Sequence, residues 1–157
     1  MKNLSLLRID DRFIHGQVIM SWVKMTKAKR IIIIDDRLVH DMFMKLIVEM
    51  AAPTGVEIDI YSEKDGVNEL KKELLVSTIV LVKTPIVINN LINNGLEFDK
   101  VNVGGMGLNY GRKTLFRNIS ATDEEVEIFK DFIKRGIDVK IQIVSTEKEY
   151  DIRNYLK

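Results

Sequence analysis

His15 lies in the segment Arg8–Val18, RIDDRFIHGQV, together with two carboxylates and an arginine. A histidine can act as a nucleophile, a general base, a metal ligand or a carrier of phosphate. The fork of Arg12 can clamp phosphate oxygens, and Asp10 or Asp11 can hold one ring nitrogen and so fix the tautomer. The alternative is structural: an aspartate caps a turn, Arg12 pairs with it, and the histidine is partly buried. Because these groups gather at the end of an expected strand, we favour a functional site.

A helix is expected to begin directly after His15. Gly16 and Gln17 stand at its start, and Ile14 comes just before the histidine. Free amides and the dipole at a helix N-terminus attract negative charge. We therefore predict that the amides of Ile14, Gly16 and Gln17 bind phosphate. Two alternatives stay open for Phe13 and Ile14: an exposed docking rim, or burial under the loop.

A second segment repeats the first pattern, since Ile34–His40 reads IDDRLVH and Ile9–His15 reads IDDRFIH. No longer repeat unit accompanies the match, so we interpret it as chance or as a shared role at a strand end. Asp35 either lines the same cleft as the first group or serves only its own turn. His40 lies several residues beyond the expected strand, where a surface position is typical.

Two further strand ends carry candidate residues. Gly104 and Gly105 follow an expected strand, where amides can approach an anion closely, or where the glycines simply reverse the chain. Lys83 and Thr84 either reach the cleft or are polar residues at a helix entry. The segment Gly107–Thr114, GLNYGRKT, lacks the spacing of a phosphate-binding loop, and no dinucleotide or nucleophile-elbow motif is present.

The elements that must position these residues alternate along the chain. Short apolar and β-branched runs predict strands at Leu4–Ile9, Arg30–Ile34, Glu57–Tyr61, Thr78–Val82, Lys100–Val103 and Val139–Val144. Several are continuously apolar, which is typical of parallel strands covered on both faces. We predict one α/β domain over residues 1–157, with an open, mainly parallel, twisted sheet of about six or seven strands and helices on both faces. In such sheets ligands bind outside the carboxyl ends of the strands.

Helical spacing separates the strands. It predicts helices over 16–26, 41–51, 64–75, from Pro85 to before Gly95, from Thr122 to Gly136, and at the C-terminus after Thr146. Capping signatures mark the last two, Thr122 with Glu125 and Thr146 with Glu149. Trp22 is expected in the core. Met42, Phe43, Leu46, Ile47 and Met50 give the second helix its spacing, and we expect Met42, Met44 and Met50 to serve packing.

Composition excludes several classes of protein. The 157 residues include 24 Lys+Arg, 23 Asp+Glu and no cysteine. A net charge of +1 argues against a dedicated nucleic-acid binder. The absence of cysteine excludes a disulfide scaffold, a thiolate zinc site and a cysteine nucleophile. The N-terminus lacks the apolar region of a signal peptide and no run approaches the ~20 residues of a membrane span, so we expect a cytoplasmic protein.

The sequence resembles the IIB component of the mannose/fructose/sorbose family of the bacterial sugar phosphotransferase system. The resemblance covers nearly the whole chain and is most specific at the first motif and at the Asn-x-Gly-Gly-Met motif. The matching segments are Ile9–Val18 with Trp22, Ala51–Val56, Leu81–Pro85, Asn102–Met106 with Gly111–Lys113, and Thr122–Glu124. Phe13 departs from the family, which usually has leucine there.

The resemblance implies a phosphocarrier, a protein-phosphohistidine–sugar phosphotransferase. In the family, the residue matching His15 takes a phosphoryl group on Nδ1 from a phosphohistidine of a IIA protein. It passes the group to a sugar delivered by the membrane subunits IIC and IID, at the inner face of the membrane. The resemblance implies no metal and no cofactor, the same fold class as above, and a free-standing IIB protein without a fused IIA domain.

Two other hypotheses stay open. A metal-dependent phosphatase-like hydrolase would use Asp10, Asp11, Asp35 and Asp36, with one or both histidines, as ligands. A non-catalytic module would bind a phosphorylated ligand on Arg12 and the glycine loops. The first predicts bound divalent metal and hydrolytic turnover. The second predicts ligand binding that survives loss of His15.

Overall fold

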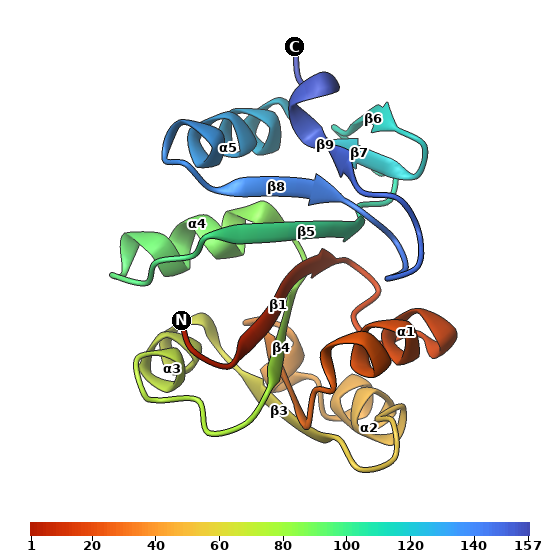
Figure 1. Ribbon diagram of the computed structural model, residues 1–157, viewed down its shortest axis with the longest axis vertical. Coiled ribbons are helices and arrows are strands. Elements are labelled where there is room, and N and C mark those ends of the chain that lie inside the picture. Colours follow the sequence, from red (N-terminus) through yellow and green to blue (C-terminus); the bar gives the residue numbers. More distant parts are fainter.

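A computed structural model describes all residues, 1–157. One seven-stranded sheet forms the centre, in the order β3-β2-β4-β1-β5-β8-β9 (Figure 1). Its strands are β1 (Leu4–Asp10), β2 (Arg30–Ile34), β3 (Glu57–Tyr61), β4 (Thr78–Val82), β5 (Lys100–Gly105), β8 (Asp138–Ile141) and β9 (Tyr150–Asp151). All pairs are parallel except β8 with β9. A separate hairpin joins β6 (Lys113–Phe116) to β7 (Ile119–Ala121).

Helices cover both faces of this sheet, as predicted. They are α1 (Gly16–Thr26), α2 (Met42–Met50), α3 (Glu63–Leu70), α4 (Pro85–Asn93) and α5 (Asp123–Lys134), with short 3-10 turns η1 (Leu38–His40) and η2 (Ile152–Asn154). In Figure 1, α1 and α2 lie on one side of the sheet, and α3, α4 and α5 on the other. No helix combines the length and apolar character that crossing a bilayer requires.

The continuous apolar runs explain the two-sided core. Ile32 and Ile34 belong to the cluster under α3, α4 and α5, whereas Ile31 and Ile33 belong to the cluster under α1 and α2. Successive side chains of a strand point to opposite faces, so a strand buried on both sides needs an apolar residue at every position. Trp22 is buried in the second cluster, as expected.

The C-terminal helix predicted after Thr146 is wrong. Tyr150–Asp151 instead pairs with β8 as the short antiparallel strand β9, and η2 follows. The rings of Tyr150 and Tyr155 lie 4.8 and 4.4 Å from that of Phe116 in the hairpin. Strand pairing and this aromatic cluster override the local capping signature. The β6–β7 hairpin was not predicted. The helix α3 ends at Leu70, five residues before the predicted end.

The core assignment of the second helix is also wrong. Only Val48 of α2 is buried, and the helix turns its apolar side chains to the solvent. The exposed residues are Met42, Phe43, Met44, Leu46, Ile47 and Met50. Helical periodicity shows that a helix has an apolar face, but it does not show which way that face points.

Candidate active site at the carboxyl end of β1

His15 lies just beyond the carboxyl end of β1, the strand at which the winding of the sheet reverses. The chain leaves β1 towards β2 on one side, whereas β5 and β8 lie on the other. This is the position at which open α/β sheets bind ligands, because loops that diverge there leave a crevice. The candidate group from the first motif is therefore at the topological switch point.

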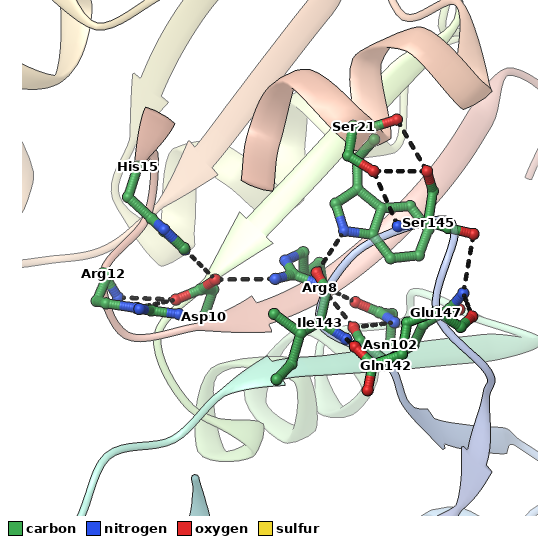
Figure 2. Close-up of polar contacts among 11 residues, drawn as sticks. Arg8, Asp10, Arg12, His15, Ser21, Asn102, Gln142, Ile143, Ser145 and Glu147 are labelled. Carbon is green, nitrogen blue, oxygen red and sulfur yellow. Dashed lines mark hydrogen bonds and ion pairs between the residues drawn. The ribbon is translucent and has the colours of Figure 1, made fainter. Parts of the chain in front are cut away.

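The imidazole of His15 is held by Asp10 (Figure 2). Nε2 of the ring lies 2.9 Å from Oδ2 of Asp10. A carboxylate can only accept a hydrogen bond, so Nε2 carries the proton and Nδ1 of the neutral ring keeps its lone pair. The side chain of His15 is 25% exposed and that of Asp10 is fully buried. The site thus presents one ring nitrogen and anchors the other.

Arg8 lies beside Asp10 (Figure 2) and is itself buried. Its guanidinium donates to Oδ2 of Asp10 at 3.0 Å, to Oδ1 of Asn102 at 2.7 Å and to the carbonyl of Gln142 at 3.0 Å. Its carbon Cζ stands 5.4 Å from the ring of Trp22. A buried ion pair holds only when its remaining polar atoms are also satisfied, as they are here. The bonds of Arg8 thus join β1, β5 and the segment that follows β8.

The segment after β8 supplies one wall of the network and is tied to α1. The indole nitrogen of Trp22 donates to the carbonyl of Ile143 at 2.9 Å. The hydroxyls of Ser21 and Ser145 lie 2.6 Å apart. The carbonyl of Gln142 that accepts from Arg8 is therefore fixed by bonds to the helix that begins after His15.

Sequence reasoning missed Arg8, Asn102 and Gln142. One signal was available: Arg8 is a charged residue between the apolar Leu7 and Ile9 of an expected strand. Such a charge needs a partner, and Asp10 is the next residue on the same face of the strand.

The charges of this network hold Asp10 in its ionised form. Burial by itself raises the pKa of the Asp10 carboxyl, but the hydrogen bond from His15 and the charge of Arg8 outweigh it, and the net pKa lies below its usual value. Burial lowers the pKa of the Arg8 guanidinium, and Asp10 opposes that effect. At neutral pH the pair beneath the histidine is therefore carboxylate and guanidinium.

Gly104 and Gly105 lie within β5 and are buried, so the alternative in which they reverse the chain is wrong. A Cβ on Gly104 would stand 2.0 Å from Cζ of Arg8, and one on Gly105 would stand 2.6 Å from Oδ1 of Asp10. Any side chain would collide with the network. The two glycines therefore give Arg8 and Asp10 the space they occupy.

The loop between β1 and α1 is folded back on Asp10. The amide of Arg12 donates to Oδ1 of Asp10 at 3.1 Å, and that of Phe13 donates to the Asp10 carbonyl at 3.0 Å. Phe13 has a φ of 57°, a left-handed conformation that costs a non-glycine residue roughly 1–2 kcal/mol. Phe13 and Ile14 are both buried, so the docking-rim alternative for them is wrong.

The first turn of α1 leaves its amides available. His15 directly precedes the helix and makes no side-chain capping bond. The amides of Gly16 and Gln17 have no acceptor within a helix that starts there. Gly16, with a φ of 42°, adopts a conformation that favours glycine. Arg12 stands beside this turn with its side chain 52% exposed and Nε 3.5 Å from Oδ1 of Asp10.

The other candidates lie around this centre in different roles. Oδ2 of Asp11 accepts from the amide of Gly107 at 2.8 Å and ties the loop to the end of β5. The ammonium of Lys83 lies 5.5 Å from the ring of Phe13, so Lys83 does approach the loop. Thr84 precedes α4 without a side-chain capping bond.

The second motif serves local structure. Oδ2 of Asp35 accepts from the amide of Leu38 at 2.8 Å, and Oδ1 of Asp36 accepts from the amide of Glu63 at 2.8 Å. His40 is exposed. The hydrolase hypothesis required Asp35 and Asp36 to converge with the first group. No set of three or more histidine, aspartate or glutamate side chains in the chain is arranged to hold a metal ion.

Comparisons with known proteins agree on one group of relatives. The family model described as "PTS system sorbose subfamily IIB component" matches residues 4–157. The PTS system fructose-specific EIIB component of Bacillus subtilis (strain 168) is 29% identical over 159 residues, with 100% of this chain and 98% of that protein covered. The PTS system mannose-specific EIIAB component of Escherichia coli (strain K12) is 31% identical over 146 residues, with 92% of this chain covered but only 45% of that protein. The IIBSor domain of the sorbose permease from Klebsiella pneumoniae superimposes with a TM-score of 0.88 at 28% identity, covering 97% of this chain and 94% of that chain.

Proposed function

The chain belongs to the sorbose subfamily of IIB components of the phosphotransferase system (PTS), and from this premise we propose that His15 is its phosphoryl carrier. His15 accepts a phosphoryl group from a phosphohistidine on a IIA protein. It then transfers the group to a sugar held by the membrane subunits IIC and IID. The fusion named EIIAB in Escherichia coli supports a IIA protein as the donor.

One observation carries the proposal: Asp10 binds Nε2 of His15 and leaves Nδ1 free. The lone pair of Nδ1 attacks the phosphorus of the donor, a new N–P bond forms, and the donor's N–P bond breaks with its electron pair returning to the donor ring. The proton on Nε2 stays between the ring and Asp10, where the carboxylate stabilises the positive charge of the phosphorylated imidazole. In the second step a sugar hydroxyl oxygen bonds to phosphorus, the hydroxyl proton is released, and the N–P bond to His15 breaks.

The surroundings of His15 suit the charge of the transferred group. Phosphoryl transfer passes through a loose transition state in which charge spreads over three oxygens, so positioning and electrostatics dominate. Arg12 and the amides of Ile14, Gly16 and Gln17 are the groups proposed to bind those oxygens. Gly104 and Gly105 contribute indirectly, by making room for Arg8 and Asp10.

The proposal also covers partners and location. Donor and acceptor groups are carried by proteins, so the carrier histidine must be accessible from outside, and the side chain of His15 is 25% exposed. The step as written needs no metal and no cofactor. The protein would act in the cytoplasm, at the inner face of the membrane that holds IIC and IID.

The test is phosphorylation of the purified protein. It is incubated with phosphoenolpyruvate, the general PTS enzymes and a mannose-family IIA protein, and its intact mass is measured. We expect one acid-labile phosphoryl group on the wild type and on His40→Ala, and none on His15→Ala. A wild-type protein that stays unmodified beside phosphorylated IIA would overturn the proposal, as would phosphorylation of His15→Ala.

A further inference from the structure

The helix α2 is amphipathic, but its apolar face points to the solvent, whereas a helix of a monomer normally packs that face against the core. Five apolar residues recur at helical spacing and form one continuous arc on this face. They are Met42 (76% exposed), Phe43 (71%), Leu46 (55%), Ile47 (43%) and Met50 (76%). The opposite side of the helix reaches the core only through Val48. In Figure 1, α2 lies at the periphery, with no other part of the chain covering its outer side.

The area of this arc is large enough for a stable association. A fully exposed large side chain contributes on the order of 200 Å², so the arc with Met44 exposes roughly 700 Å² of apolar residues. The largest apolar patch of a typical monomer is about 300–600 Å². A specific interface of ordinary size buries about 800 Å² on each partner. The arc therefore supplies most of one such interface.

The charges of α2 favour one kind of partner. The helix carries a single cation, Lys45, and a single anion, Glu49, side by side along one edge of the arc. Neither takes part in an ion pair within the chain. A bilayer surface selects helices with several basic residues, which α2 does not have. One cation and one anion on the same edge can instead pair with the anion and the cation of a second copy of α2.

We propose that α2 is the interface of a homodimer in which two copies of the helix pack antiparallel about a two-fold axis near Leu46 and Ile47. A two-fold axis between antiparallel helices brings the same edge of each together in reversed order. Lys45 then faces the partner's Glu49, and the reciprocal pair forms on the other side of the axis. Phe43 packs near the partner's Met50. This inference does not depend on the chemistry of His15, which lies outside the arc.

The test measures the oligomeric state of the full chain by sedimentation equilibrium and by light scattering after gel filtration. We expect a wild-type dimer at micromolar concentration and a folded monomer for Leu46→Glu. Leu75→Glu is the matched control: Leu75 is 82% exposed but lies outside α2, between α3 and β4, so this variant should stay dimeric. Circular dichroism checks that each variant is folded.

A charge exchange tests the register independently of apolar burial. Lys45→Glu places like charges opposite each other twice in the dimer and should weaken association about tenfold or more, and adding Glu49→Lys should restore it. A wild type that is monomeric at all concentrations would overturn the proposal, and so would its binding to phospholipid vesicles or to another PTS subunit through α2 instead. Dissociation by Leu75→Glu, or a dimer that survives Leu46→Glu, would also overturn it.

Discussion

Two segments of this chain share one pattern and end as different structures. Ile9–His15 and Ile34–His40 both carry Ile-Asp-Asp-Arg and a histidine three residues later, at the carboxyl ends of β1 and β2. In the first, the first aspartate holds the histidine at 2.9 Å. In the second, Asp35 accepts from the amide of Leu38 at the start of η1, and His40 is exposed. The pattern alone does not decide which segment becomes a site.

The residue two positions before the first aspartate makes the first difference. Arg8 in β1 is a buried cation that bonds to Asp10, whereas the matching residue of β2 is the buried, apolar Ile33. Asp10 is therefore buried, and its carboxylate bonds to both Arg8 and His15. Asp35 meets no such cation, so its carboxylate turns to the nearest amide, that of Leu38.

The residue that precedes each helix makes the second difference. Asp41 accepts from the amide of Met44 at 3.0 Å and so satisfies the start of α2. His15 makes no capping bond to α1, and its first amides stay open to an anion. The buried Arg8 next to Asp10 and the uncapped helix after His15 thus distinguish the proposed phosphate site from an ordinary turn.

Replacing the first aspartate of each segment should give the largest contrast. Asp10→Asn removes the charge that compensates buried Arg8, and we expect a loss of about 3–5 kcal/mol in the free energy of unfolding. Asp35→Asn keeps an oxygen that can accept from the amide of Leu38, so we expect a loss of about 1 kcal/mol or less. Urea unfolding measures both. Equal losses would show that Arg8 does not set the two segments apart.

Two glycines give the next contrast, because each lies against one of the segments. A Cβ on Gly104 would meet the Arg8 guanidinium at 2.0–2.2 Å, and one on Gly66 would meet the Ile34 side chain at 2.8–3.2 Å. Gly104→Ala should cost about 2–3 kcal/mol through displacement of bonded Arg8. Gly66→Ala presses on the buried Ile34 side chain but displaces no bonded charge, and it gains about 1 kcal/mol in helix propensity, so its net loss should be smaller than that of Gly104→Ala.

The rate of phosphorylation should likewise fall more in Gly104→Ala than in Gly66→Ala. Gly104→Ala disturbs the support of Asp10 and should slow phosphoryl uptake from the IIA protein, and Gly66→Ala should leave the rate unchanged. Uptake by Gly104→Ala at the wild-type rate, in a folded protein, would mean that the Arg8 network is not needed to position His15.

The pH dependence of stability isolates the charge of Asp10. Its pKa in the folded protein lies below the ordinary value of 3.8. A lowered pKa contributes stability that is fully present above that ordinary value and is lost as pH falls through the folded value. The gap in stability between wild type and Asp10→Asn should therefore be constant near neutrality and shrink below pH about 4. A gap that stays constant to pH 2 would indicate that the loss in Asp10→Asn is steric.

The sequence predicted the sheet and the centre of the site for local reasons. Runs such as Ile31–Ile34 leave few alternatives to a strand buried on both faces. His15, Asp10 and Arg12 lie within six residues of one another and at an expected strand end, so their proximity needed no tertiary information. Both predictions rest on features that a single segment carries.

The sequence could not predict what depends on distant segments. Arg8 bonds to Asn102 and Gln142, which are 94 and 134 residues away along the chain. Thr146 with Glu149 is a sound helix signal locally, yet the pairing of Tyr150 with β8 prevails. The apolar period of α2 is real, but only the fold shows that it faces outwards. In the same way, Ile9–His15 and Ile34–His40 share a motif, and the residues around each motif decide its different structure.

The helix caps give the smallest contrast. Asp41→Ala removes the bond to the amide of Met44 and should lower stability by about 1 kcal/mol, with phosphorylation of His15 unchanged. Gly16→Ala meets no atom within 4 Å but must adopt a φ of 42°, so it should also cost about 1 kcal/mol. Gly16→Ala should also affect the reaction: strain in the first turn of α1 would move the amides proposed to bind phosphate, so phosphoryl uptake should slow. Thermal unfolding and the rate of phosphoryl uptake, measured on both variants, separate the two. If Asp41→Ala slowed uptake as much as Gly16→Ala, the second segment would contribute to the site, and the division drawn between the two segments would fail.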